Sequence, residues 1–129
     1  MKVSMLFLIV PVLVLSGCMN SASDKIREFI PGTYVRQIHN EYTNGSDTLM
    51  IKLQDESAGV YLIDKMVGYQ KHIDGRTFPP KHETSQWTAV YDEKLHQLIV
   101  QNQGFIIVFD PAKNQLMSNR TLYDKITKK

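Results

Sequence analysis

The sequence is poorest in cysteine, since Cys18 is the only one among 129 residues. A single thiol cannot form an internal disulfide, so a chain of one-domain length must be stabilised by its own core. An excess of charge is missing too, because 15 basic and 13 acidic residues give a formal charge of +2 and the two signs are interspersed. Without a basic face, the sequence predicts no nucleic-acid partner.

Signatures of catalysis are also missing. The sequence contains no Gly-x-Ser-x-Gly elbow and no glycine-rich phosphate cradle, so we predict neither enzymatic activity nor a cofactor. The histidines are not spaced i, i+2 or i, i+4 from one another, which predicts no metal site: His39, His72, His82 and His96. Several aspartates fall at expected turns, where this side chain bonds to the local backbone: Asp47, Asp55, Asp74, Asp92 and Asp110.

The sequence also lacks an apolar run long enough to span a membrane. Residues 1–17 are almost entirely apolar between Val3 and Leu15, with Pro11 in the middle. A membrane-spanning helix needs about 20 apolar residues, so this segment is too short. Together with Lys2, the short run is typical of a cleavable secretory signal peptide. An uncleaved anchor is the alternative.

The segment ends in Leu15-Ser16-Gly17-Cys18. This stretch resembles the lipobox of bacterial lipoproteins, in which a branched apolar residue and two small residues precede a cysteine. The resemblance implies cleavage before Cys18, a diacylglycerol thioether on its sulfur and usually a further acyl chain, such as palmitate, on its amino group. Two or more acyl chains anchor a protein stably to a bilayer. A leftover cysteine in a soluble secreted protein is the alternative.

These features predict a lipid-anchored protein of a bacterial cell envelope. Residues 18–23 are small and polar and form a short lipidated tether, and residues 24–129 form a single β-rich domain. In many lipoproteins an aspartate after the cysteine favours the inner membrane. Met19 stands there instead, so the resemblance implies the outer membrane, with periplasmic or surface exposure left open.

A short helix is predicted where the domain begins, within "SASDKIREFIPG". Ser21 and Asp24 form a capping-box pattern, and Ile26, Phe29 and Ile30 form one apolar stripe at helical spacing. We expect this stripe to cover one edge or one mouth of the sheet that follows.

Beyond the helix, apolar residues alternate with polar ones, which predicts strands in "TLMIKLQ", "VYLIDKMVGYQKHI" and "ETSQWTAVYDE" and in shorter runs after them. Asn44-Gly45 predicts a hairpin turn, because both residues tolerate positive φ. Gly68 predicts a bulge or bend in a long strand, and Pro79-Pro80 predicts a longer turn.

Seven or eight sequential strands with short turns predict an all-β antiparallel meander with a short N-terminal helix. Two architectures compete: a small up-and-down barrel, similar in outline to lipocalin-like domains, and a strongly curved open sheet. A barrel leaves no exposed sheet edges, so we favour it.

Aromatic side chains are the only candidates for contact with a ligand or partner. Tyr61 and Tyr69 share one face of a predicted strand, and Trp87 and Tyr91 share one face of another. Such residues combine apolar area with a polar tip, which suits a binding face. Ordinary core packing is the alternative reading.

Four stretches, "FIPGTYVR", "DTLMIKLQDES", "WTAVYDE" and "FDPAKNQL", resemble a family of small bacterial lipoproteins found alongside conjugative transposon genes. The resemblance implies an envelope accessory protein of a mobile element. With no catalytic residues in view, we predict a non-enzymatic module that binds or scaffolds an envelope protein. A lipocalin-like carrier of a small apolar ligand or lipid is the alternative.

Overall fold

The structure is a computed structural model and describes residues 22–126. The predicted signal peptide at 1–17 and the predicted lipidation site Cys18 lie outside these residues. The elements are α1 (Ala22–Phe29), β1 (Gly32–His39), β2 (Thr43–Asp55), β3 (Val60–Ile73), β4 (Arg76–Thr77), β5 (Lys81–Asp92), β6 (Gln97–Val100), β7 (Ile106–Asp110), η1 (Pro111–Lys113), β8 (Gln115–Ser118) and β9 (Thr121–Lys125). Because α1 begins at Ala22, the last two residues of the predicted tether are helical.

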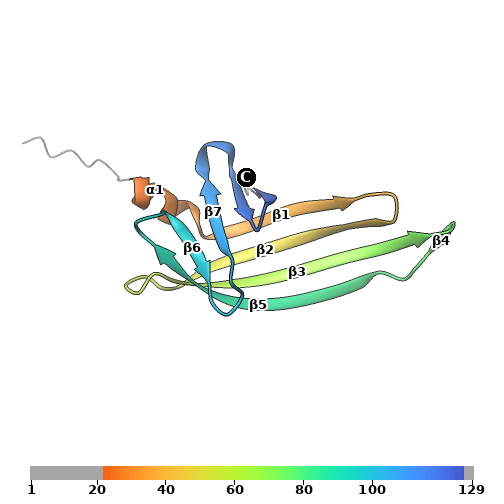
Figure 1. Cartoon of the computed structure of the whole chain (residues 1–129), viewed down its shortest axis with the longest axis horizontal. Helices are drawn as coiled ribbons and strands as arrows, with labels where there is room; N and C mark the ends of the chain where they lie inside the picture. The colour runs from red at the N-terminus through yellow and green to blue at the C-terminus, as the bar shows by residue number, and fades with distance from the viewer. Residues whose placement is uncertain (1–21, 127–129) are drawn as a thin grey trace, which may run out of the picture.

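The strands form a closed antiparallel barrel (Figure 1). Their order is β2-β1-β9-β8-β7-β6-β5-β3-β4, and β2 also pairs with β3. Eight strands therefore close on themselves, while the short β4 pairs only with the far end of β3. The predicted all-β meander, the N-terminal helix and the barrel are confirmed, and the alternative of an open sheet is not what forms.

Alternation along the strands sends every second side chain into the barrel. The buried core combines aliphatic and aromatic side chains from both long and short strands: Tyr34, Leu49, Ile51, Tyr61, Ile63, Ala89, Leu98, Ile107, Phe109 and Leu116. Leu53 has the same phase as Leu49 and Ile51, yet it is exposed, and the pairing of β2 with β3 shifts just beyond it, between Leu53 and Asp55.

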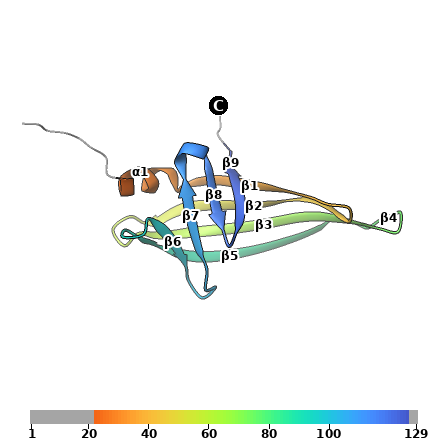
Figure 2. The same cartoon turned by 45° about the horizontal axis from the view of Figure 1, so that its top comes forward.

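Helix α1 covers one end of the barrel (Figure 2). Ile26 and Phe29 pack against the core, as their spacing predicts, and Ile30 just after the helix is fully buried. The hydroxyl of Tyr34 donates to the backbone oxygens of Phe29 and Ile30, at 2.8 and 3.0 Å. These bonds satisfy carbonyls that a helix C-terminus leaves unpaired, so the helix end is tied to the barrel wall.

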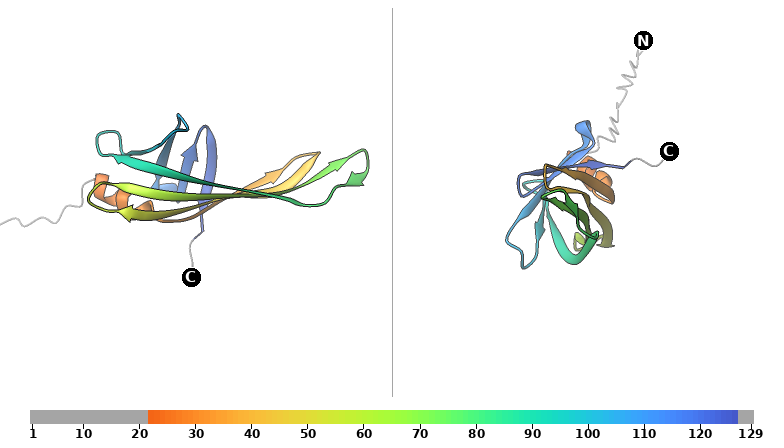
Figure 3. Two further views of the ribbon diagram at one scale, coloured as in Figure 1. Left: turned by 90° about the horizontal axis from the view of Figure 1, so that it is seen from below. Right: turned by 90° about the vertical axis from the view of Figure 1, so that its right-hand side faces the viewer.

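The long strands β2, β3 and β5 continue past the other end of the barrel (Figures 1 and 3). We call this projection the arm, and it comprises residues 43–46, 66–77 and 81–86 with the end of β1. Residues 81–86 of β5 are all exposed, and β5 pairs with β6 only from Ala89 onward. The arm therefore adds little to the core and carries an open edge on β5.

The predicted turn at Asn44-Gly45 is wrong, since both residues lie inside β2, paired with Gln70 and Tyr69. The chain turns earlier, where the side chain of Asn40 accepts bonds from the backbone nitrogens of Tyr42 and Thr43, at 2.9 and 2.8 Å. Asn40 thus makes the side-chain hydrogen bonds of the turn that the sequence predicts at the Asn-Gly pair.

Glycine at position 45 serves close packing between strands. A Cβ atom there would collide with the backbone oxygen of Gly68 and would lie 2.7 Å from the Cα of Tyr69. The bulge predicted at Gly68 is also wrong, because the register of β3 continues unshifted through that residue on both sides. Gly45 therefore lets β2 and β3 approach each other, whereas a Cβ atom at Gly68 would meet only the side chain of His82.

Candidate functional site

The barrel end opposite α1 contains a polar pocket with Asp47 in its wall. Asp47 on β2, Arg36 on β1 and Lys65 on β3 point inward, because each has the phase of buried residues two positions away. Tyr123 on β9 completes the cluster. We call this site, which has a volume of about 220 Å³, the Asp47 pocket.

Asp47 is the buried acceptor of this cluster, with 3% of the residue exposed. Its Oδ2 atom accepts a 2.6 Å hydrogen bond from the hydroxyl of Tyr123. The same oxygen lies 3.5 Å from Nζ of Lys65 and 3.6 Å from a terminal nitrogen of Arg36. Two polar atoms of the cluster, Asp47 Oδ1 and Arg36 Nε, are buried without a hydrogen-bond partner.

Aromatic rings form one wall of the Asp47 pocket. The rings of Trp87 and Phe105 meet edge to face, with centroids 5.1 Å apart. Nζ of Lys65 lies 5.3 Å from the centre of the Trp87 ring, within range of a cation–π interaction. Ser118, Asn119 and Thr121 add hydroxyl and amide groups near the β8–β9 turn.

Burial raises the pKa of the Tyr123 phenol well above its ordinary value. The hydrogen bond to Asp47 and the negative charge of that carboxylate raise the pKa further, whereas Arg36 opposes them. Tyr123 is therefore a neutral donor to Asp47 throughout the physiological pH range.

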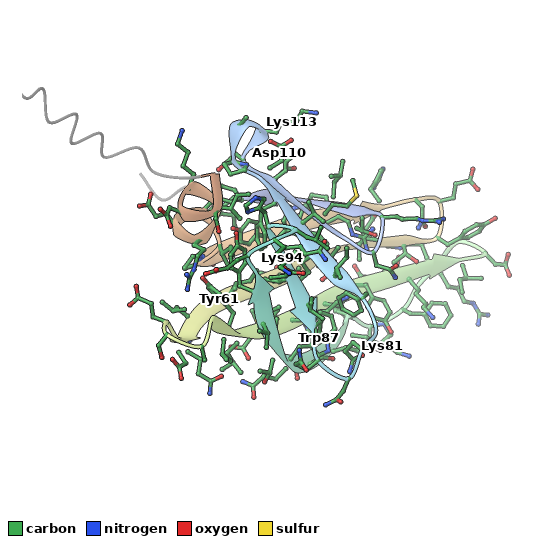
Figure 4. The ribbon with its side chains drawn as sticks, turned by 60° about the vertical axis from the view of Figure 1, so that its left-hand side comes forward. Tyr61, Lys81, Trp87, Lys94, Asp110 and Lys113 are labelled. Atoms are coloured by element: carbon green, nitrogen blue, oxygen red, sulfur yellow. The ribbon has the colours of Figure 1, made fainter. Side chains whose placement is uncertain are left out.

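The four aromatic residues predicted to contact a ligand or partner lie in different parts of the molecule, and Figure 4 labels two of them, Tyr61 and Trp87. Trp87 lines the Asp47 pocket, whereas Tyr61 and Tyr91 are buried core residues nearer to α1. The hydroxyl of Tyr91 lies 3.0 Å from that of Ser23 on the helix. Tyr69 lies on the arm, where its hydroxyl donates to Glu83 at 3.3 Å. The structure therefore does not bring the four together.

Sequence reasoning missed most of the Asp47 pocket. Asp47 was expected at a turn, and that expectation is wrong, because it followed from the misplaced Asn44-Gly45 turn. By contrast, Asp55, Asp92 and Asp110 do accept bonds from local backbone nitrogens, as turn residues do. The alternation along β3 was the sequence signal that could have indicated the pocket, since Lys65 lies on the same face as Tyr61 and Ile63.

A second candidate surface lies outside the barrel. Outward side chains of neighbouring strands form a continuous apolar row, which we call the outer stripe: Ile99, Ile106, Val108, Met117 and Leu122. Ladder pairs join most of them directly, Ile99 with Ile106, Val108 with Met117, and Met117 with Leu122. Each is 40–52% exposed. A contiguous exposed apolar patch marks an interaction surface more often than scattered residues do.

The outer stripe is hollowed and has charges at its ends. A depression of about 380 Å³ lies over Ile106, Val108 and Met117, and Arg120 stands at its rim. Toward α1, the outward positions that follow the stripe carry Asp110 and Asp124, both exposed. The surface is therefore apolar in the middle, basic at one end and acidic at the other.

Within residues 22–126, no three side chains of His, Cys, Asp or Glu are grouped so that they could hold a metal ion. His39 and His72 both contact the side chain of Asn44, and Nδ1 of His72 also lies 3.0 Å from the hydroxyl of Thr77. None of the helices in the described part of the chain has the length and apolar character needed to cross a membrane.

The fold and these sites define a small helix-capped β-barrel with a polar pocket at its open end and an apolar stripe on its outer wall. Comparison with protein-family models, with curated proteins and with solved structures gave no match to this chain.

Proposed function

We propose that this chain is a lipid-anchored protein of a bacterial cell envelope, and that it acts as a non-enzymatic module that binds a protein partner. The observation that carries the binding role is the outer stripe, a contiguous row of half-exposed apolar side chains on strands β6 to β9. Exposure of such a row to water is energetically unfavourable, and a protein partner would bury it.

The chemistry of the partner follows from the charges around the stripe. A complementary surface presents an apolar ridge to the hollow at Val108 and Met117, an acidic group to Arg120, and basic groups to Asp110 and Asp124. The resemblance to lipoproteins of conjugative elements suggests that such a partner belongs to a transfer apparatus of the envelope.

The carrier alternative has less support. Buried side chains fill the barrel between α1 and the Asp47 pocket, and that pocket is small and charged. A lipid or other apolar ligand needs a roomy apolar cavity, typically 300 to about 1,000 Å³. We therefore propose binding on the outer wall.

The binding proposal is tested by site-specific photocrosslinking in the native envelope, with the crosslinker at position 117 or at position 66. Met117 and Met66 are matched, since both are outward methionines, 44% and 43% exposed. We expect position 117 to capture one specific protein through an apolar segment. Met117→Lys should lower its co-purification at least about tenfold, whereas Met66→Lys should not.

The charge pattern gives a sharper criterion for the partner. Arg120→Glu should weaken the complex. Replacing the partner's acidic residue nearest the crosslink with lysine should then restore binding to the Arg120→Glu variant. Recovery of free monomer alone, across growth conditions and with crosslinking, would contradict the proposal. Equal losses from Met117→Lys and Met66→Lys would contradict it too.

The anchor is tested separately with Cys18→Ser. Loss of the sulfur removes the acylation site, so the variant should leave the membrane fraction and lose all label from radioactive fatty acid. Ser21→Ala keeps the lipobox and should remain labelled and membrane-bound. The anchor proposal fails if Cys18→Ser still fractionates with membranes and the native protein takes up no label.

A further inference from the structure

We propose that the Asp47 pocket is a binding site for a carboxylate group, held between Arg36 and Lys65. The site lies inside the barrel end, away from the outer stripe, so either proposal can fail without the other. The chemistry shared by a small organic acid and by the C-terminus of a peptide fits the pocket equally, and the experiment below distinguishes the two sources.

The first argument is charge. Arg36 and Lys65 carry two positive charges against the single negative charge of Asp47, which leaves the pocket with a net charge of +1. Walls of Trp87 and Phe105 keep the local dielectric low and strengthen this field. A carboxylate carries one negative charge and balances it, whereas a phosphate brings about −1.5 to −2.

The second argument is unused hydrogen-bonding capacity. Nζ of Lys65 and the terminal nitrogen of Arg36 lie 3.5 and 3.6 Å from Oδ2 of Asp47, beyond good hydrogen-bond distance, while Tyr123 occupies that oxygen at 2.6 Å. Asp47 therefore holds the two cations in place without saturating their donors. A planar carboxylate suits a guanidinium because it can accept two parallel hydrogen bonds.

The third argument is size and access. At about 220 Å³ the pocket fits a terminal group and not a drug-sized ligand. The side chains of Arg36 and Lys65 are 39% and 27% exposed, so both reach the opening. Asn119 and Thr121 at the rim offer polar contacts to whatever the carboxylate is attached to.

Trp87 provides the measurement, because it is the only tryptophan of the chain and lines the pocket. The full-length protein in detergent is titrated with lactate, with the peptide acetyl-Gly-Gly-Ala and with the amides of both, at constant ionic strength in chloride. We expect a saturable change in Trp87 emission with the carboxylates, with a dissociation constant of about 1 mM or tighter, and none with the amides. Tighter binding of lactate would assign a free acid as the ligand, and tighter binding of the peptide would assign a chain terminus.

Two lysines on β3 give the matched variants. Lys65→Gln removes one pocket cation, and Lys71→Gln removes the same charge from the arm, where Nζ of Lys71 lies 5.8 Å from the Tyr69 ring. Lys65→Gln should weaken carboxylate binding at least about tenfold, and Lys71→Gln should leave it unchanged. Arg36→Gln should reproduce the loss, which keeps the test decisive if one variant unfolds in a thermal melt.

Several results would overturn the assignment. These are no saturation with either carboxylate, equal responses to the amides, tighter binding of inorganic phosphate than of both carboxylates, or equal losses from the two lysine variants.

Discussion

Two buried phenols lie at opposite ends of the barrel. Tyr34 is fully buried under α1, and burial raises the pKa of its phenol well above 10.0. Tyr123 is buried at the Asp47 pocket, and its pKa is raised in the same direction. The folded state therefore favours the protonated form of both phenols, which makes the free energy of unfolding depend on pH in the alkaline range.

The first prediction concerns that alkaline range. A group whose pKa is raised by folding contributes stability that is complete below its unfolded pKa and is lost as pH rises toward its folded pKa. The contribution of the two phenols to the free energy of unfolding, measured in urea, should therefore be constant up to about pH 10 and then fall by up to about 1.4 kcal/mol per pH unit for each phenol. Tyr34→Phe/Tyr123→Phe should flatten this fall.

The criterion is the slope of the free energy of unfolding against pH, because removing the two hydroxyls also lowers the free energy of unfolding at neutral pH. Tyr42→Phe is the control, since it removes the same hydroxyl from a side chain that is 61% exposed. Lys125 acts with the opposite sign, because desolvation lowers its pKa, and it is present in every variant. An alkaline slope that is identical in the wild type and the double variant would refute the assignment.

At the scale of the element, β2 shows how strand packing overrides a local turn signal. Asn44-Gly45 has the composition of a tight turn, yet the long ladder with β3 pairs Thr43 through Asp55 with residues 60–71. Placing the turn at Asn40 instead gains ladder hydrogen bonds and puts Asp47, Leu49 and Ile51 on the inward face. A turn at residues 44–45 would end these pairs early.

The second prediction is that Gly45→Ala is strongly destabilising. The added methyl group meets the backbone of Gly68 and Tyr69, which cannot move without separating β2 from β3. We expect a loss of about 2 kcal/mol or more in the free energy of unfolding, measured by urea denaturation.

Gly68→Ala is the matched control within the same region. A methyl group there would lie 3.1 Å from Nδ1 of His82, an exposed side chain that is able to rotate away. Its cost should be well below that of Gly45→Ala. If the two glycine variants were equally stable, Gly45 would have no special packing role in β2.

At the scale of the whole molecule, the protein divides into a stable barrel and an arm with few buried side chains. The barrel is closed by ladders on every side and capped by α1, whereas the arm is a twisted extension of its longest strands (Figure 3). Lys81 and Glu83 lie along the open edge of β5, and charged residues at such an edge oppose pairing with other chains.

The third prediction follows from this division. Amide hydrogens of residues 66–73 and 81–86 should exchange with deuterium at least about tenfold faster than those of residues 61–63 and 89–91 on the same strands. Local opening costs less where few apolar contacts must be broken. Mass spectrometry of peptic fragments measures both regions in one experiment, and uniform protection along β3 and β5 would contradict the expected division.

Strand phase, read from the sequence, determined the antiparallel meander, and helical spacing determined its N-terminal helix. Alternation in "VYLIDKMVGYQKHI" located β3 with its bounds and its inward face, because period-two burial is a local property of a strand. The cysteine and the short apolar run predicted the lipid anchor without any fold, since a lipobox is a linear signal.

Only the tertiary structure decided where the sites lie. Arg36, Asp47, Lys65 and Tyr123 come from four strands, and no spacing in the sequence relates them; the closing of the barrel brings them together. The outer stripe likewise depends on the register between β6, β7, β8 and β9. Register is set by packing across the whole barrel, so the sequence fixes which side chains point inward or outward but not which of them meet.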